Sequence, residues 1–394
     1  MTTLCWGLFL FFATDLGDVV VVPIDGPPVS VVKFSADGAV VGGVPKPGNG
    51  EPTKWPLRDL TGIRFPSQPP TALSGIQLRL ADDEALKCSA VESATADEFK
   101  VRGNLFGSIS IPCEAIVGAI LDPDADENQS HRVHEWLKRP RDSDALLFRN
   151  FDESKGSFQE LDDGSVTMEV DGTKKKTPRS QVLALAFDPR LLQPKKFNDA
   201  FAFVRLSDGT RLRISKLTAT LERTETATLE TVLGPTLTVK REHLVDASIR
   251  NGRVFYLSDL KELKSTFTTY LDDAWPMQRD RAVTGAPMKI AGRGFDKGLG
   301  VRSGSSLTFA AAGYSRFEAM IGLDDAAGPL GHAIFSIEVD GKRIGEPLAA
   351  IAGAPPTPIR VPLEKAKTVT LRVDFGKRGD VQDFADWGDA RFVK

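Results

Sequence analysis

The chain is poor in the residues that define several common protein classes. Its 394 residues include only 3 cysteines and 4 histidines. So few cysteines exclude a disulfide-rich scaffold, and Cys88 and Cys113 are interpreted as two small buried side chains, with a disulfide between neighbouring strands as the alternative. No P-loop, G-x-S-x-G elbow or dinucleotide-binding glycine motif occurs. No enzyme signature stands out in the sequence.

Charge of one sign is also scarce. The 50 basic and 53 acidic residues leave a net charge of −3. A dedicated nucleic-acid binder usually carries a basic domain, so we expect no nucleic-acid partner. With 41% hydrophobic and 26% charged residues, the composition is that of a folded chain.

Long apolar runs are limited to one, from Leu4 to Ala13. This run is too short to span a bilayer and is typical of a signal-peptide core, although no Lys or Arg precedes it. We therefore predict a signal-peptide-like segment over residues 1–17 and an exported protein: periplasmic, cell-surface or secreted. The alternatives are a mis-called start codon and an ordinary buried strand. No transmembrane segment is expected elsewhere.

Abundant turn residues favour an all-β protein, with 35 glycines and 25 prolines in the chain. An internal match at a spacing of about 126 residues, far longer than solenoid repeats, suggests two related domains. "LRLADDEALKCSAVES" (78–93) aligns with "VRLSDGTRLRISKLTA" (204–219), and "KWPLRDLTGIRF" (54–65) aligns with "KTPRSQVLALAF" (176–187). Each copy predicts a small β-barrel or sandwich.

The alternation of apolar and polar residues within the second copy predicts which side chains face the interior of the β domain. In "RLRISKLTATLE" the inner face is expected to carry Leu212, Ile214, Leu217 and Leu221, with an irregularity between Ile214 and Leu217. The predicted organisation is a β domain over 18–121, a linker with a short helix over 122–155, a second β domain over 156–250, and a different domain over 252–394.

The last third is predicted to be a β-sandwich of short, turn-bounded strands. Its segments "YLSDL" (256–260), "KGLGVRSGS" (297–305), "YSRFEAMIGLDD" (314–325), "FSIEVDGK" (335–342) and "DFADWGDARF" (383–392) occur in order. Together they resemble the NPCBM/NEW2 domain, a galactose-binding-like jelly roll. The resemblance implies a glycan-binding domain of the kind that is often appended to glycoside hydrolases and to other exported bacterial proteins. The chain as a whole resembles exported multidomain proteins of planctomycete-type bacteria.

Two positions depart from the family pattern. Histidine is frequent where Arg302 stands in the G-L-G element, and again before A-D-W, where this chain has Phe384. Without both imidazoles, the usual ligand specificity of the family is not expected to carry over.

The closing segment supplies several candidate sugar-binding residues. In one interpretation Trp387 is an apolar platform for a sugar ring, while Asp383 and Asp386 accept hydroxyl hydrogen bonds. In the other, Trp387 is a core residue. A strand beginning at Asp386 is expected to place Trp387, Asp389 and Arg391 on one face.

Loop residues complete the candidate site. Trp275 precedes a proline beside charged residues, and Arg302 is placed to orient a hydroxyl. Asp324 and Asp325 follow a strand, where they could bind sugar hydroxyls, hold a structural calcium ion or make the turn. No cofactor is required by this interpretation.

The predicted function is non-catalytic binding of a glycan or cell-surface polysaccharide through the last domain. One alternative is an assembly protein whose β domains contact a protein partner or copies of itself. A glycoside hydrolase is a third possibility, but no carboxylate pair is singled out for that chemistry.

Overall fold

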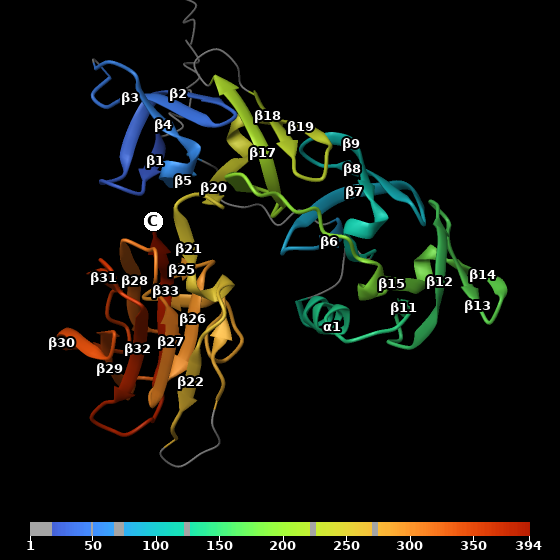
Figure 1. The fold of residues 1–394 in the computed structure, drawn as a ribbon. Coiled ribbons are helices and arrows are strands. Elements are labelled where there is room, and N and C mark those ends of the chain that lie inside the picture. The colour runs from blue at the N-terminus through green and yellow to red at the C-terminus, as the bar shows by residue number, and fades with distance from the viewer. Residues whose placement is uncertain (1–17, 49, 67–74, 122–126, 221–225, 270–274) are drawn as a thin grey trace, which may run out of the picture. The chain divides into compact units, whose positions relative to one another are not determined.

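Strands make up almost all of the regular structure, as the predicted all-β class requires (Figure 1). The computed structural model describes residues 18–48, 50–66, 75–121, 127–220, 226–269 and 275–394, apart from the side chains of 127–131. The chain divides into unit 1, ending at Gly252, and unit 2, starting at Arg253. No helix of the described part is long and apolar enough to cross a membrane. The predicted signal segment lies outside the described residues.

Unit 1 is built from four segments of five strands each. In chain order their strands are β1 (Val19–Pro23), β2 (Val29–Asp37), β3 (Val40–Pro45), β4 (Thr53–Pro56) and β5 (Leu60–Arg64) in segment I; β6 (Ile76–Leu80), β7 (Ala85–Thr95), β8 (Glu98–Gly103), β9 (Gly107–Pro112) and β10 (Ile116–Ile120) in segment II; β11 (Asp144–Phe148), β12 (Glu153–Leu161), β13 (Ser165–Val170), β14 (Thr173–Pro178) and β15 (Val182–Ala186) in segment III; and β16 (Phe201–Leu206), β17 (Arg211–Thr220), β18 (Thr226–Thr231), β19 (Thr236–Lys240) and β20 (Leu244–Arg250) in segment IV.

The four segments share one local pattern. Each has a single 3₁₀ turn before its fifth strand: η1 (Leu57–Asp59), η2 (Cys113–Ala115), η3 (Arg179–Gln181) and η5 (Arg241–His243). The sequence matches fall on corresponding elements, β6–β7 with β16–β17 and β4–β5 with β14–β15. A further 3₁₀ turn, η4 (Pro189–Leu191), follows β15, and α1 (Glu127–Leu137) lies where the short helix was expected.

Strand pairing closes two rings, each made from two segments. Segments I and IV form ring 1 through the antiparallel pairs β1–β2, β2–β17, β17–β16, β16–β20, β20–β5 and β5–β1. Segments II and III form ring 2 through β6–β7, β7–β12, β12–β11, β11–β15, β15–β10 and β10–β6. In each segment the third and fourth strands extend the sheet as a hairpin.

The expected division of this region into separate domains over 18–121 and 156–250 is therefore corrected. Ring 1 joins the first and last segments, and ring 2 joins the two in the middle. The physical reason is that a single segment leaves unpaired strand edges, and a partner segment removes them. Internal sequence similarity identifies equivalent segments, but it does not say which segments pair.

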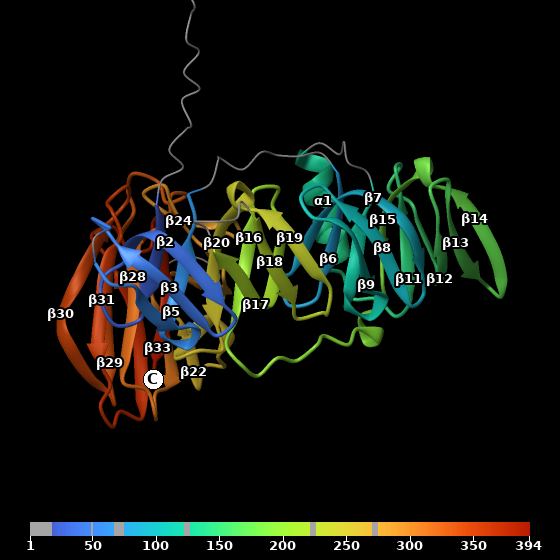
Figure 2. The same cartoon turned by 90° about the horizontal axis from the view of Figure 1, so that it is seen from above.

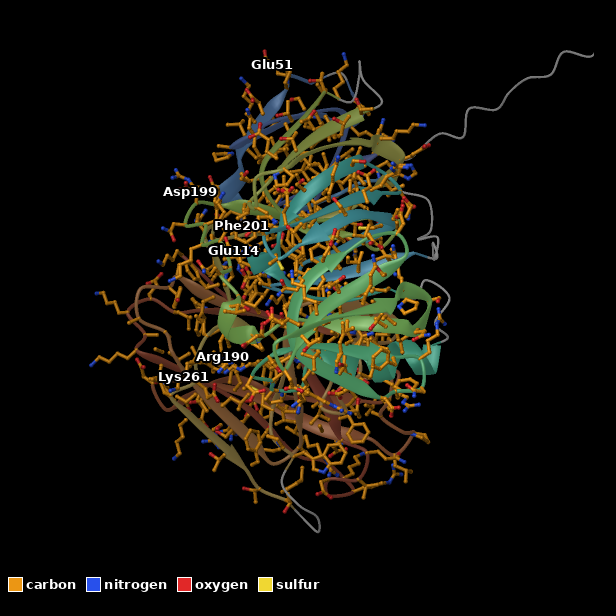
Figure 3. The ribbon with its side chains drawn as sticks, turned by 90° about the vertical axis from the view of Figure 1, so that its right-hand side faces the viewer. Glu51, Glu114, Arg190, Asp199, Phe201 and Lys261 are labelled. Carbon is orange, nitrogen blue, oxygen red and sulfur yellow. The ribbon has the colours of Figure 1, made fainter. Side chains whose placement is uncertain are left out.

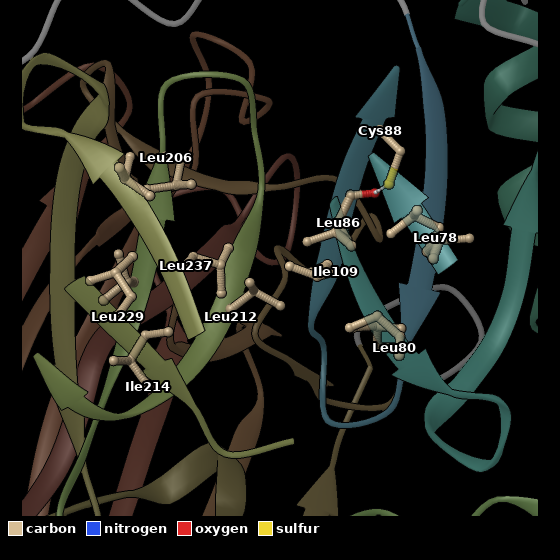
Figure 4. Close-up of a cluster of buried hydrophobic side chains, with 14 of the residues drawn as sticks. Leu78, Leu80, Leu86, Cys88, Ile109, Leu206, Leu212, Ile214, Leu229 and Leu237 are labelled. Atoms are coloured by element: carbon tan, nitrogen blue, oxygen red, sulfur yellow. Dashed lines mark hydrogen bonds between the residues drawn. The ribbon is translucent and has the colours of Figure 1, made fainter. Parts of the chain in front are cut away.

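Each ring is filled by apolar side chains. Figure 4 shows Leu78, Leu80 and Leu86 in ring 2 and Leu212 and Ile214 in ring 1, all buried. The predicted inner face of β17 is confirmed at Leu212, Ile214 and Leu217, and the register shifts between Ile214 and Lys216. Leu221 lies outside the described residues.

Many charged side chains lie on the outside of unit 1. Figure 3 labels Glu51, Glu114, Arg190 and Asp199, and all four are exposed. This arrangement follows the cost of burying an unpaired charge.

One buried ion pair joins the two rings. The Glu84 carboxylate accepts hydrogen bonds from the backbone N–H (2.6 Å) and the Nε (2.8 Å) of Arg213, and β7 meets β17 at Ala85 and Arg211. Burial raises the pKa of Glu84, and the hydrogen bonds from Arg213 oppose that shift. Arg213 also pairs with Asp82 (2.6 Å), so it is the loss of Arg213 that would leave the Glu84 charge buried and unpaired.

Unit 2 is a two-sheet sandwich, visible in Figures 1 and 2. One sheet has the order β23-β26-β33-β28-β31, with β21 also paired to β33, and the other has the order β22-β27-β32-β29-β30. Their bounds are β21 (Val254–Tyr256), β22 (Lys264–Phe267), β23 (Gln278–Arg279), β26 (Gly298–Arg302), β27 (Ser305–Ala310), β28 (Arg316–Leu323), β29 (His332–Val339), β30 (Lys342–Ile351), β31 (Thr357–Pro362), β32 (Thr368–Phe375) and β33 (Phe384–Val393), with one 3₁₀ turn, η6 (Leu257–Asp259).

A small hairpin, β24 (Met288–Ile290) and β25 (Arg293–Phe295), packs on the first sheet away from the sandwich core. Glycines in the sheet allow this close approach. A Cβ at Gly322 would stand 2.5 Å from Ile290 Cγ2, and one at Gly388 would stand 2.7 Å from the Phe295 ring. The hairpin therefore buries sheet positions that would otherwise face solvent.

The ring pairing predicts which fragments fold alone. A fragment of residues 75–188 contains all six strands of ring 2 and should fold, whereas residues 18–121 contain half of each ring and should not. Far-ultraviolet circular dichroism and amide NMR dispersion of the two fragments measure this. A well-dispersed spectrum from 18–121, with none from 75–188, would contradict the pairing.

Candidate functional site

The last strand, β33, positions most of the predicted site residues. It lies between β26 and β28, with Asp386 opposite Gly300 on one side and Gly322 on the other. Asp389 has φ +51°, and three residues of β33 span two residues of β28 at this point. This bulge changes which side chains share a face.

Trp387 belongs to the core of the sandwich. Its exposed fraction is 0%, and its ring lies edge-on to Phe335, with 5.1 Å between ring centroids. The platform interpretation of Trp387 is therefore corrected, because a buried ring offers no face to a sugar. The predicted sharing of one face by Trp387, Asp389 and Arg391 is also wrong, because the bulge puts Trp387 on the same side as Phe392.

Asp386 faces the opposite side of the same strand, and it is also fully buried, with an exposed fraction of 0%. No donor of the described residues reaches either of its carboxylate oxygens. Burial, followed by the nearby charges of Asp324 and Asp325, raises its pKa to about 9. Asp386 is therefore protonated at neutral pH, and as an acid it can donate a hydrogen bond to Asp324.

Asp324 and Asp325 tie the covering hairpin to the end of β28. Asp324 accepts hydrogen bonds from the backbone N–H of Lys289 (2.9 Å) and of Ala326 (2.9 Å), and Asp325 accepts one from Gly292 (2.9 Å). Asp324 is 3% exposed. Of the roles expected for these residues, the turn-making role is the one these bonds describe, and the buried carboxylate of Asp324 is not placed to meet a sugar.

The calcium expectation stays a prediction. Among the residues described here, no group of three His, Cys, Asp or Glu side chains is arranged to hold a metal ion. The carboxylate oxygens of Asp324 accept from backbone amides, whereas no donor among the described residues reaches those of Asp386.

A second group of predicted residues gathers where β26 ends and β33 begins. Arg302 and Phe384 are opposite one another in the register. Trp275 stacks on Phe384, with 5.8 Å between centroids and 18° between ring planes, and it is 38% exposed. The Arg302 guanidinium carbon lies 5.0 Å from the Trp275 ring centroid. This aromatic–arginine cluster joins segments far apart in the sequence.

Arg302 is hydrogen-bonded to the loop before β33. Its Nη2 donates to the backbone oxygen of Asp380 at 2.9 Å and lies 3.9 Å from the Asp380 carboxylate. Its Nε is buried, and no acceptor among the described residues reaches it. The guanidinium is thus fixed in place with donor capacity left over.

A hollow beside this cluster is lined by Phe267, Thr268, Thr269, Trp275, Arg302, Ser303 and Asp380. Its volume of about 10 Å³ has room for roughly one water molecule. A sugar ring cannot enter it, so any ligand here must bind across the surface, against the exposed part of Trp275.

Asp383 lies next to this cluster but is itself 1% exposed. Burial raises its pKa, and the hydrogen bond from the His332 backbone N–H (2.8 Å) opposes that shift. Asp383 therefore fastens the start of β33 to the start of β29. Its contact with a ligand would be indirect, through the loop that it holds.

The seven predicted residues thus fall into separate places. Trp275 and Arg302 meet at the surface, and Asp383 is buried next to them. Asp324, Asp325 and Asp386 lie around the hairpin. Trp387 is in the core. Phe384 and Asp380 belong to the surface cluster but were not predicted as site residues. The sequence did contain a reason to include Phe384 in the site, because Phe384 and Arg302 occupy the two positions that depart from the family pattern.

Comparison with protein families agrees with the sequence resemblance. Residues 253–393 match the model of the NPCBM/NEW2 domain. A Renibacterium salmoninarum protein, provisionally named endo-alpha-N-acetylgalactosaminidase, is 33% identical over 125 residues. That match covers 30% of this chain and 8% of the relative, so the chain spans a small fraction of the relative's length.

Solved carbohydrate-binding modules of the CBM51 class are also similar. The CBM51 of a Clostridium perfringens GH95 protein, in complex with methyl-galactose, is 22% identical; the match covers 36% of this chain and 99% of that one, with a TM-score of 0.33. A Clostridium perfringens ZmpB structure with CBM51-2, GlcNAc and INT domains is 24% identical over 43% of this chain and 36% of that one, with a TM-score of 0.34.

The buried acid predicts an unusual pH response. Asp386→Asn should raise the free energy of unfolding at pH 7 by roughly 1–4 kcal/mol, because Asn needs no proton to stay buried beside Asp324. With the folded pKa at about 9 and an ordinary value of 3.8, the native Asp386 costs stability increasingly as pH rises between these values. Urea unfolding from pH 4 to pH 9 should therefore show a flatter profile for the variant.

Asp374→Asn is the matched control, since Asp374 is exposed on β32 of the same unit. It should leave the profile unchanged. A loss of stability in Asp386→Asn at pH 7, reproduced in the native protein by a calcium chelator, would instead show that the carboxylate is ionised and bound to a cation.

The core position of Trp387 predicts a structural phenotype. Trp387→Ala should lower the free energy of unfolding by about 3–5 kcal/mol, because it removes a fully buried aromatic ring. Thermal unfolding followed by near-ultraviolet circular dichroism measures this. Unchanged stability together with lost glycan binding would return Trp387 to a ligand-contact role.

Proposed function

We propose that unit 2 binds a glycan, without catalysis, at the aromatic–arginine cluster of Trp275, Arg302, Phe384 and Asp380. The observation that carries the proposal is Trp275. It is a partly exposed aromatic ring, stacked on Phe384 and backed by the guanidinium of Arg302. The match of residues 253–393 to the NPCBM/NEW2 domain supports it.

The chemistry of the cluster suits a sugar. The free part of the Trp275 ring offers an apolar surface to the C–H face of a pyranose. The Arg302 guanidinium beside the ring carries N–H groups beyond the one that donates to Asp380, and such groups can donate to a sugar hydroxyl. Because the hollow is too small for a ring, we expect a surface contact with one or two sugar residues.

The acids of unit 2 support a non-catalytic role. A glycoside hydrolase needs two carboxyl groups that reach the scissile bond. Asp324 and Asp386 are one close pair of acids in this unit, and they are 3% and 0% exposed. A substrate cannot reach them while the hairpin covers them.

Export is part of the same proposal, since a surface glycan is met outside the cytoplasm. Both described cysteines, Cys88 and Cys113, are free and buried. Burial raises the pKa of each thiol to about 12. Because the thiolate is the reactive form, these side chains should remain unreactive in an oxidising compartment.

The assembly alternative has one feature in its favour. β30 is an edge strand that carries exposed Ile344, Leu348 and Ile351. However, Gly345 has φ +70°, the register shifts within the strand, and Pro347 lacks a backbone N–H. These features discourage addition of another strand, so the edge favours the binding function over assembly.

The test is a glycan-array screen of the full chain, followed by a titration of the strongest hit. Trp275→Ala should weaken binding by tenfold or more, about 1.4 kcal/mol, because the stacking surface is lost. Trp275→Phe should retain part of the affinity. Ile351→Ala, which truncates a 55% exposed apolar side chain elsewhere in unit 2, is the control and should bind normally.

Two outcomes would contradict the proposal. One is the absence of any glycan that binds the folded chain. The other is equal affinity in the native protein and Trp275→Ala, which would place the site elsewhere.

A further inference from the structure

A pocket in unit 1 is the feature that the glycan proposal for unit 2 does not use. It has a volume of about 360 Å³ and lies between α1 and the turn that joins β11 to β12. This volume is at the lower end of small-ligand pockets, about 300–1,000 Å³, and suits a single ring-sized ligand. Its lining combines apolar and charged side chains: Arg132, Glu135, Trp136, Arg139, Leu147, Phe151 and Glu153.

The frame of the pocket is rigid. α1 packs through Val133, Trp136 and Leu137 on the apolar face of neighbouring strands. The Trp136 indole Nε1 donates to Glu153 Oε1 at 2.7 Å, and Arg139 Nη1 approaches the same oxygen at 3.4 Å. These contacts fix Glu153 at the rim and lock the helix against β12.

Phe151 holds a strained backbone conformation at the pocket. Its φ is +67°, a region that bulky residues rarely adopt. Hydrogen bonds from Phe151 N to Phe148 O and from Phe148 N to Asp152 O close the turn around it. Such strain persists only where the surroundings impose it, and it often occurs at ligand-binding sites. Here it aims the ring at Arg132.

Arg132 lies flat over that ring, with its guanidinium carbon 3.6 Å from the ring centroid. Stacking on an aromatic face orients the guanidinium plane and leaves its N–H edge free to form two parallel hydrogen bonds to an oxyanion. Among the described residues, no ion pair includes Arg132. The two pocket acids are already engaged, Glu135 with Lys138 and Glu153 with Trp136 and Arg139. The uncommitted charge of the pocket is therefore positive.

We propose that this pocket binds a monosaccharide-sized carboxylate, the hexuronate residue of an acidic glycan. The carboxylate would meet the N–H edge of Arg132, and the ring would lie against Leu147 and Phe151. The Glu153 carboxylate and the Arg139 guanidinium at the rim offer an acceptor and a donor to the ring hydroxyls. This inference does not depend on glycan binding at the unit 2 cluster.

The experiment is a titration of the full chain with sodium glucuronate, followed by NMR or calorimetry, with glucose and inorganic phosphate as comparison probes. Saturable binding of glucuronate is expected, with glucose at least tenfold weaker because it has the same ring but no carboxylate. Arg132→Gln should weaken glucuronate binding by tenfold or more. Phe151→Leu, which keeps the charge but removes the flat ring, should weaken it severalfold.

Two controls separate this site from the others. Lys174→Gln removes an exposed cation of unit 1 outside the pocket and should leave glucuronate binding unchanged. Trp275→Ala should also leave it unchanged, even though it disables the unit 2 cluster. Thermal unfolding of each variant checks that the fold is intact.

The proposal is overturned if glucuronate shows no saturable binding, or if Arg132→Gln binds it as tightly as the native chain does. Phosphate binding with equal affinity would reduce the pocket to a general anion contact and would also overturn it. Loss of glucuronate binding in Trp275→Ala would place the acidic sugar in unit 2 instead.

Discussion

The cross-strand pairing of β33 is the constraint on which unit 2 depends. This strand pairs with β21, β26 and β28, so its register determines what lies on both sides of the sheet. On one side it places Trp387 in the core. On the other it places Asp386 under the β24–β25 hairpin, and at its start it sets Phe384 opposite Arg302. One strand thus links core packing, a buried acid and the surface cluster.

Unit 1 depends on the same kind of pairing at a larger scale. Its four five-strand segments have the same local order, and each ring closes only when two of them combine. The buried pair of Glu84 and Arg213 then joins the two rings where β7 meets β17. The connection between β10 and β11 is not part of either ring and contains α1. The pocket at Arg132 and Phe151 lies beside this helix.

Several residues that are far apart in the sequence are in contact in the structure. Trp275 and Phe384 are 109 positions apart in number and stack ring on ring. Asp324 follows the end of β28, Asp386 lies on β33, and the two meet beneath a hairpin that neither belongs to. Acidic residues that look like a polar site in sequence are, in the structure, hydrogen-bond acceptors for backbone amides or a buried acid. Glycines at 322 and 388 make this burial possible, because they let the β24–β25 hairpin approach the sheet.

The sequence by itself determined the all-β class, the start of the last domain to within one residue, the short helix near residue 130 and the inner face of β17. These features follow from local properties: alternation of apolar residues, turn residues and an ordered set of motifs. Only the tertiary structure decided which segments of unit 1 share a ring, because equivalent segments have equivalent patterns and pairing is a long-range choice. It also decided which residues share a face with Trp387, since the bulge at Asp389 reverses the alternation that a regular strand would have. The partial exposure of Trp275 and the burial of Asp386 also depend on segments that are distant in the chain. Phe384 packs against Trp275, and the β24–β25 hairpin covers Asp386.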